Sequence, residues 1–157
     1  MSADILLPTL FDEINMTNIE RRLKIKLNEL SCEEVKELIL EYKKFLFLFL
    51  LYKDQNYLLA PGYLVDEVWH EHILHSKQYY EDCLKMFDGT ILHHFPSSNN
   101  EGESLSDTYM LYEKTFGSLP PNKYWMSRLL TDSNVPCCGN GGGGTTGCRG
   151  GSCSPGK

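Results

Sequence analysis

The chain has 157 residues, of which 41% are hydrophobic and 11% aromatic, which is enough for one modest core and one domain. The net charge is −6, and the segment from Ser133 onward carries only basic charged residues, so the part before it is the acidic one. An acidic body excludes a large phosphate-binding face, because nucleic-acid affinity comes mainly from clustered Lys and Arg. DNA is therefore not expected as a partner.

The longest apolar run, Phe45–Tyr52, is far shorter than the ~20 residues that a membrane span needs. The first residues show no pattern of a secretory signal. We therefore expect a cytoplasmic protein without a membrane partner. Of its six cysteines, two lie in segments with a helical pattern, and in a reducing cytosol the four near the C-terminal end would be free thiols or ligands of soft metal ions.

The first two helices are predicted from their start signals. A Ser/Thr-x-x-Glu capping box at 17–20 predicts a helix to about Leu27, and a second box at 31–34 predicts a longer helix through Lys53. The stretch 45–51 of the longer helix is apolar nearly all round. We expect it to be the central and most buried element.

Two further helices follow in the chain. Pro61 suits the first turn of a third helix, which the pattern extends to about Phe87 with Gly89 as a left-handed cap. A fourth helix is predicted to start at Ser104 and to stop at Gly117. Both predictions rest on apolar residues that recur at helical spacing.

The last part of the chain is different in composition. Residues 124–130 can add a short turn or helix, but 133–157 is rich in glycine and cysteine and has almost nothing apolar to pack. We predict an all-α fold, a compact bundle of about four to five helices over 1–132, followed by a disordered Gly/Cys-rich tail over 133–157.

All five histidines fall within 25 residues of one another: His70, His72, His75, His93 and His94. On a regular helix, Asp66 and His70 are four residues apart and share one edge of the core-facing stripe. His70 and His72 point about 160° apart at ~100° per residue, so they cannot easily bind one ion. His75 is expected at the surface, and Cys83 is expected to be a small core residue rather than a nucleophile.

The clustered histidines predict a metal site. If a reverse turn at 88–89 folds the following residues back beside the third helix, Asp66, His70 and one of the pair His93 and His94 supply two imidazoles and a carboxylate. Such a donor set with open positions suits catalysis by Zn²⁺ or by non-haem Fe²⁺. The predicted ligands are Asp66, His70, His93 and His94, with His72 as a fifth candidate. The sequence leaves open whether the domain is an enzyme.

Four alternatives stay open. The histidines could be structural, with Asp66 capping, pairing locally or fixing the tautomer of His70. The protein could be a non-enzymatic module that contacts a protein or RNA through its tail, or the tail could be a substrate for modification. The tail thiols could also hold a soft ion, although their spacing matches no zinc finger. They are Cys137, Cys138, Cys148 and Cys153.

Two segments resemble a known family. Val65–Leu74, which contains Trp-His-x-His-x-Leu, and Leu92–Pro96, which contains His-His-x-Pro, are similar to motifs of the glycine-rich domain-containing proteins. The resemblance extends over about 41–117, and short members of the family also end in Gly/Cys-rich tails. It implies that Asp66 and the histidines other than His75 occupy motif positions. It implies no activity, because the family is largely uncharacterised, although larger plant relatives are linked to stress responses and RNA binding.

Overall fold

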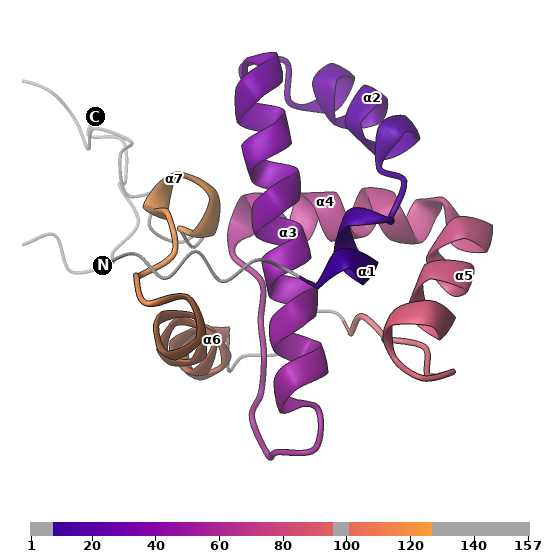
Figure 1. Cartoon of the computed structure of the whole chain (residues 1–157). Coiled ribbons are helices and arrows are strands. Elements are labelled where there is room, and N and C mark those ends of the chain that lie inside the picture. The colour runs from indigo at the N-terminus through magenta and orange to yellow at the C-terminus, as the bar shows by residue number, and fades with distance from the viewer. Residues whose placement is uncertain (1–7, 96–100, 127–157) are drawn as a thin grey trace, which may run out of the picture.

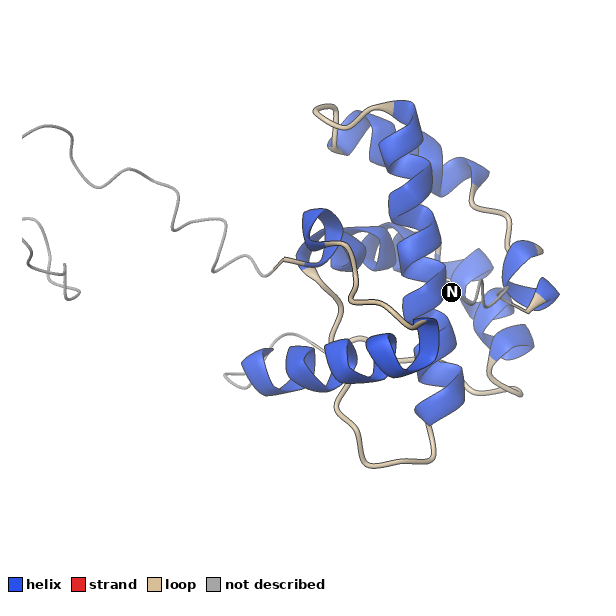
Figure 2. Ribbon diagram, turned by 60° about the vertical axis from the view of Figure 1, so that its left-hand side comes forward, coloured by secondary structure: helices blue, strands red, loops and turns tan. Residues whose placement is uncertain are grey.

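The structure, a computed structural model, describes residues 8–95 and 101–126, the side chains of 101–104 excepted. Within this described part there are seven α-helices and no strand (Figures 1 and 2), which confirms the predicted all-α fold. The number exceeds the expected four to five, because two helices have only four residues and one predicted helix is divided. The predicted tail at 133–157 lies outside the described residues.

The central helix is α3, Cys32–Tyr52, which runs through the middle of the molecule with the other helices around it (Figure 1). Its predicted start is confirmed. The Ser31 hydroxyl accepts from the backbone N–H of Glu34, and the Glu34 carboxylate accepts from the backbone N–H of Ser31 at 2.7 Å. This reciprocal pairing satisfies two donors that the first turn of a helix otherwise leaves open.

The helix before it is α2, Thr17–Lys26, and its predicted capping box is wrong. The N-cap is Met16, so Thr17 already lies inside the helix and its hydroxyl caps nothing. The side-chain oxygen of Asn15 accepts the backbone N–H of Thr17 at 3.0 Å instead. The short helix α1, Thr9–Asp12, was not predicted, because four residues are too few to show a helical period.

The core forms around the apolar stretch of α3, as expected. The helix buries Val35, Leu38, Ile39, Tyr42, Phe45, Leu46, Phe47 and Leu48, whereas Leu51 at its end is 45% exposed. The ring of Phe45 contacts Trp69 of α4 and Trp125 of α7 at centroid distances of 5.5 and 5.9 Å. Of the helices described, none has the length and hydropathy needed to cross a membrane.

The predicted third helix is two helices, α4 at Tyr63–Leu74 and α5 at Ser76–Met86. The break lies at His75, whose backbone has φ −84° and ψ 58°. The ring N–H of His75 donates to the carbonyl of Glu71 at 2.8 Å, so the side chain competes with the helical ladder for that acceptor. In Figure 1, α5 departs from the line of α4. After the break, Tyr79 and Cys83 are both buried in the core, as was expected of Cys83.

The reverse turn predicted after α5 is present. Asp88 and Gly89 both have positive φ, 50° and 81°, and the backbone N–H of Gly89 donates to the carbonyl of Leu84. Glycine adopts this left-handed conformation without steric cost, which makes the turn favourable here. The chain after it lies close to α5, because the hydroxyl of Tyr79 donates to the carbonyl of Leu92 at 2.5 Å.

The last two helices lie on the side of α3 that is opposite α1 and α5 (Figure 1). Helix α6, Glu101–Phe116, begins three residues before the predicted Ser104 and ends at Gly117, as predicted. Helix α7, Asn122–Trp125, is held by a buried carboxylate. Glu41 of α3 accepts from the indole N–H of Trp125 and from a tyrosine hydroxyl of α6, at 2.9 and 2.8 Å.

Candidate metal centre

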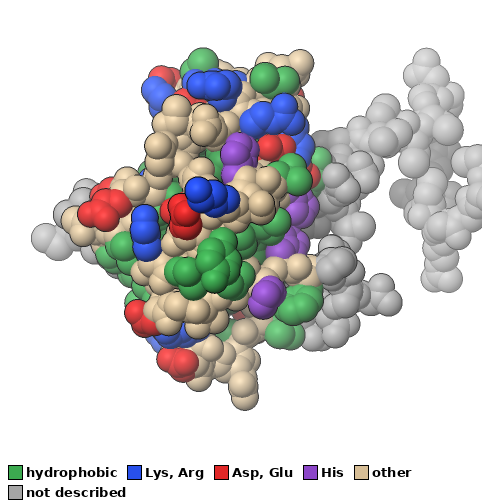
Figure 3. All heavy atoms as spheres, turned by 90° about the vertical axis from the view of Figure 1, so that its right-hand side faces the viewer, with side chains coloured by type: hydrophobic (Ala, Val, Ile, Leu, Met, Phe, Trp, Pro, Cys, Tyr) green, Lys and Arg blue, Asp and Glu red, His purple; other side chains and the backbone are tan. Residues whose placement is uncertain are grey.

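Three polar side chains from two segments converge beside the N-terminal part of α4. Asp66 and His70 lie one turn apart on that helix, and His94 is brought to them by the reverse turn that follows α5. Nε2 of His94 lies 2.7 Å from Oδ1 of Asp66, and Nε2 of His70 lies 3.6 Å from Oδ2. Figure 3 shows histidine side chains gathered along one edge of the face turned to the viewer.

The ring of His94 is held from several directions. It stacks on Trp69 at a centroid distance of 4.2 Å and on His70 at 4.8 Å. Trp69 is in turn fixed, because its indole N–H donates to the hydroxyl of Tyr79 at 2.9 Å, and that hydroxyl donates to the backbone of the segment carrying His94. The position of His94 is therefore determined by the packed core and by the turn.

The second nitrogen of His94 has a suitable partner for a metal ligand. Nδ1 lies 3.1 Å from the carbonyl oxygen of Phe95. Without an ion, the N–H at Nε2 donates to Oδ1 of Asp66 at 2.7 Å. With an ion bound, Nδ1 would carry the proton and donate to Phe95, and Nε2 would present its lone pair to the ion. A backbone carbonyl that fixes the tautomer in this way is the usual companion of a metal-bound histidine.

The donor atoms of Asp66, His70 and His94 all lie within 4.8 Å of one another. Donors around one tetrahedral Zn²⁺ are about 3.3 Å apart, since each lies ~2 Å from the ion. The rings of His70 and His94 are within 18° of parallel, so their lone pairs do not yet meet at one point. Binding requires His70 to turn. Its side chain is 44% exposed, against 17% for His94, which leaves it room to do so.

Two of the predicted ligands are not in this group. His93 is exposed, and of the adjacent pair only His94 points to Asp66. His72 is wholly buried and has both ring nitrogens engaged elsewhere, so the structure does not bring it into this group. The helical geometry that separates His70 and His72 by about 160° explains the difference.

His72 instead forms the middle of a buried hydrogen-bonded chain. The hydroxyl of Tyr42 lies 2.9 Å from its Nδ1, and Nε2 lies 3.0 Å from Oδ2 of Asp82 on α5. Burial lowers the pKa of His72, although the bond to Asp82 opposes this, and burial raises the pKa of Tyr42 well above its ordinary value. A neutral imidazole that accepts from Tyr42 and donates to Asp82 satisfies all three groups.

Sequence reasoning assigned no role to Tyr42 or Asp82. Tyr42 occupies one of the apolar positions of the predicted second helix, which gave no reason to expect a polar role. Asp82 lies ten residues after His72 in the chain, and the two side chains meet because the chain bends at His75. Cys83 is fully buried, as expected for a core residue, and burial raises the pKa of its thiol, which keeps it protonated and unreactive.

Fold and site together define a small all-α domain with an open cluster of two histidines and one aspartate beside a buried Tyr–His–Asp chain. The chain belongs to the UCP032817-like family, whose model matches residues 11–110. Two similar proteins of Arabidopsis thaliana are glycine-rich domain-containing protein 2, 32% identical over 110 residues, and glycine-rich domain-containing protein 1, 28% identical over 110 residues.

Each match covers 65% of this chain but only 13% of the relative, so the chain corresponds to a small part of these much longer proteins. The family match confirms the resemblance seen in the sequence, and it spans every residue of the candidate centre. No solved structure matches the chain significantly.

Proposed function

We propose that this domain binds one divalent transition-metal ion through Asp66, His70 and His94. The observation that supports the proposal most strongly is that these three side chains converge although His94 lies 28 residues after Asp66 in the chain. Nε2 of His94 lies 2.7 Å from Oδ1 of Asp66. Two imidazoles and one carboxylate form a donor set that Zn²⁺ and Fe²⁺ both accept.

The exposure of the group bears on what the bound ion could do. Asp66 and His70 are 30% and 44% exposed, so one side of the ion would face solvent and keep positions for water or a substrate. A metal with open positions lowers the pKa of bound water or accepts a substrate oxygen. We therefore extend the proposal to a metal-dependent reaction at this site, with Zn²⁺ or Fe²⁺ as the ion.

The test is metal binding by the full chain, purified without a histidine tag. Calorimetry with Zn²⁺, and absorption spectra after loading Co²⁺, should give one site with nitrogen and oxygen donors. His94→Gln, His70→Gln and Asp66→Asn should each weaken it by about tenfold or more, since each removes one of three ligands. A background in which the four tail cysteines are replaced by serine keeps thiol sites from contributing.

The adjacent histidine supplies a matched control. His93 is exposed and lies outside the group, so His93→Gln should bind metal as the unmodified chain does. Equal affinity in all these variants would contradict the proposal, as would a loss in His93→Gln as large as that in His94→Gln.

The second candidate function, contact with a protein or RNA through the tail, depends on residues 133–157 outside the described part. Its test is recovery of partners from extracts with the full chain and with a chain that ends at 132. Recovery of the same partners by both chains would contradict it.

A further inference from the structure

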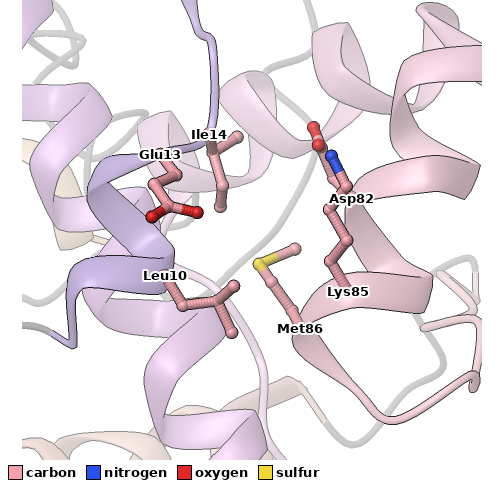
Figure 4. A pocket seen from close by; sticks show the side chains of 6 residues that line it. All are labelled: Leu10, Glu13, Ile14, Asp82, Lys85 and Met86. Atoms are coloured by element: carbon pink, nitrogen blue, oxygen red, sulfur yellow. The ribbon is translucent and has the colours of Figure 1, made fainter.

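A small cavity lies between α1 and α5, and the buried Tyr–His–Asp chain ends at it. Its volume is about 110 Å³, and its lining is shown in Figure 4: Leu10, Glu13, Ile14, Asp82, Lys85 and Met86. The first three come from α1 and the residues after it, and the last three come from α5. None of them belongs to the candidate metal centre.

The charged groups around this cavity are of both signs. Glu13 contributes a carboxylate from one wall, and Asp82 and Lys85 contribute a carboxylate and an ammonium group from the other (Figure 4). Among the described residues, no ion pair joins Lys85 to either carboxylate. The Lys85 ammonium group and the Glu13 carboxylate are therefore left for solvent or for a ligand that carries the opposite charges, while Asp82 is engaged through one of its two oxygens.

Asp82 differs from the other two because it is held in place. Its side chain is only 10% exposed, and His72 and Gln78 both donate to Oδ2. Oδ1 is the oxygen that remains for a ligand, since a carboxylate has about four acceptor positions. Gln78 also donates to the carbonyl of Asn15 at 2.6 Å, which ties α5 to the segment after α1. The walls of the cavity are therefore connected.

The remaining lining is apolar. Ile14 and Met86 are buried, and Leu10 is half-buried. For comparison, an engineered apolar cavity of ~150 Å³ takes up benzene. A cavity of about 110 Å³ therefore accepts a branched group of about four carbons, with its charged groups directed to the rim.

We propose that this cavity binds a small zwitterion of the α-amino-acid class. Its ammonium group would lie between Asp82 and Glu13, its carboxylate would pair with Lys85, and its aliphatic side chain would contact Ile14 and Met86. Asp82 is the binding group, and His72 and Tyr42 are positioning residues that act through it. This site is separate from the proposed metal centre and does not depend on it.

The test titrates the full chain with three matched compounds, followed by backbone amide shifts in NMR. L-valine carries both charges, isobutylamine lacks the carboxylate, and 3-methylbutanoate lacks the ammonium group. Valine should saturate the shifts of residues around the cavity with a dissociation constant at least about threefold lower than that of either analogue, since each analogue loses one charged contact at the exposed rim.

Two variants at exposed positions assign the contacts without disturbing the core. Lys85→Met should lower the affinity for valine to that for isobutylamine and leave the affinity for isobutylamine unchanged. Glu13→Gln should lower the affinities for valine and isobutylamine alike and leave the affinity for 3-methylbutanoate unchanged. Lys77→Met and Glu81→Gln, also exposed on α5, are the matched controls and should change nothing.

Four outcomes would overturn the proposal. Three of them are the absence of saturable shifts at the cavity, equal affinity for all three compounds, and valine affinity that is insensitive to both Lys85→Met and Glu13→Gln. Binding of isobutylamine as tight as that of valine would also overturn it, because the site would then recognise a simple amine.

Discussion

His70 and His72 stand two residues apart on α4 and differ in almost every physical respect. His72 is wholly buried, and protein groups occupy both of its ring nitrogens. The side chain of His70 is 44% exposed, and its nearest charged neighbour is a carboxylate 3.6 Å away. Residue type alone therefore says little about a histidine's role. The side of the helix that it occupies decides whether it supports the fold or stays available to a ligand.

The largest expected difference between the two histidines is in stability, when each is replaced by alanine in turn. His72→Ala should lower the free energy of unfolding by about 3–5 kcal/mol, because it leaves Asp82 and the Tyr42 hydroxyl buried without their partner. His70→Ala should lower it by less than about 1 kcal/mol, since the side chain is only half-buried and no buried group loses its partner. Urea titration followed by circular dichroism measures both, and equal losses would contradict the distinction.

A metal ion should stabilise the fold only by binding to the cluster of Asp66, His70 and His94. At a free Zn²⁺ concentration 100 times the dissociation constant, the free energy of unfolding should rise by about 2.7 kcal/mol. The same rise is expected in His93→Gln, whereas in His94→Gln at the same Zn²⁺ concentration it should be smaller by about 1.3 kcal/mol or more. Unfolding in the presence and absence of Zn²⁺ measures it, and a rise in His94→Gln equal to that of the unmodified chain would place the metal elsewhere.

The buried Tyr42–His72–Asp82 hydrogen-bonded chain should make the stability of the fold decline at high pH. Because the pKa of Tyr42 is raised in the fold, the unfolded chain loses this proton first, at about pH 10, while the folded chain keeps it. Stability from this group is thus full below pH 10 and declines as the pH rises above it. Tyr42→Phe should cost about 1 kcal/mol at pH 7 and make the decline less steep. Unfolding measured from pH 8 to 11 tests this, and an unchanged slope would contradict it.

The smallest effect concerns thiol chemistry. Cys83 is fully buried with a raised pKa, whereas Cys32 is exposed at the start of α3. Iodoacetamide at pH 8 should modify Cys32 at least about tenfold faster, because only the accessible thiolate reacts. Peptide mass spectrometry over time measures both rates. Similar rates would show that the segment around Cys83 opens readily.

The sequence predicted what depends on local signals. The box at Ser31, the apolar length of α3, the stop at Gly117 and the turn at Gly89 follow from neighbouring residues, and the structure has all four. The break at His75 could not be predicted in this way. It depends on a side chain that bonds to a backbone carbonyl of its own helix, which no apolar period records.

The same limit applies to the candidate centre. The pairing of Asp66 with His70 follows from helical spacing, but the choice of His94 over His93 depends on Trp69, on which only one of the two rings stacks. Tyr42 and Asp82 meet at His72 because three helices pack together. Such long-range partners are set by tertiary packing, which the periodicity of a single segment does not contain.

The stacking of Trp69 on His94 gives the molecule a built-in optical signal. The chain has two tryptophans, and Trp125 is buried against α6 and α3, whereas the indole of Trp69 lies 4.2 Å from the ring of His94. An ion held by that imidazole would alter the excited state of Trp69 and leave Trp125 nearly unaffected. A change in emission on adding Ni²⁺ or Cu²⁺, lost in Trp69→Phe, would read out occupancy without any attached label.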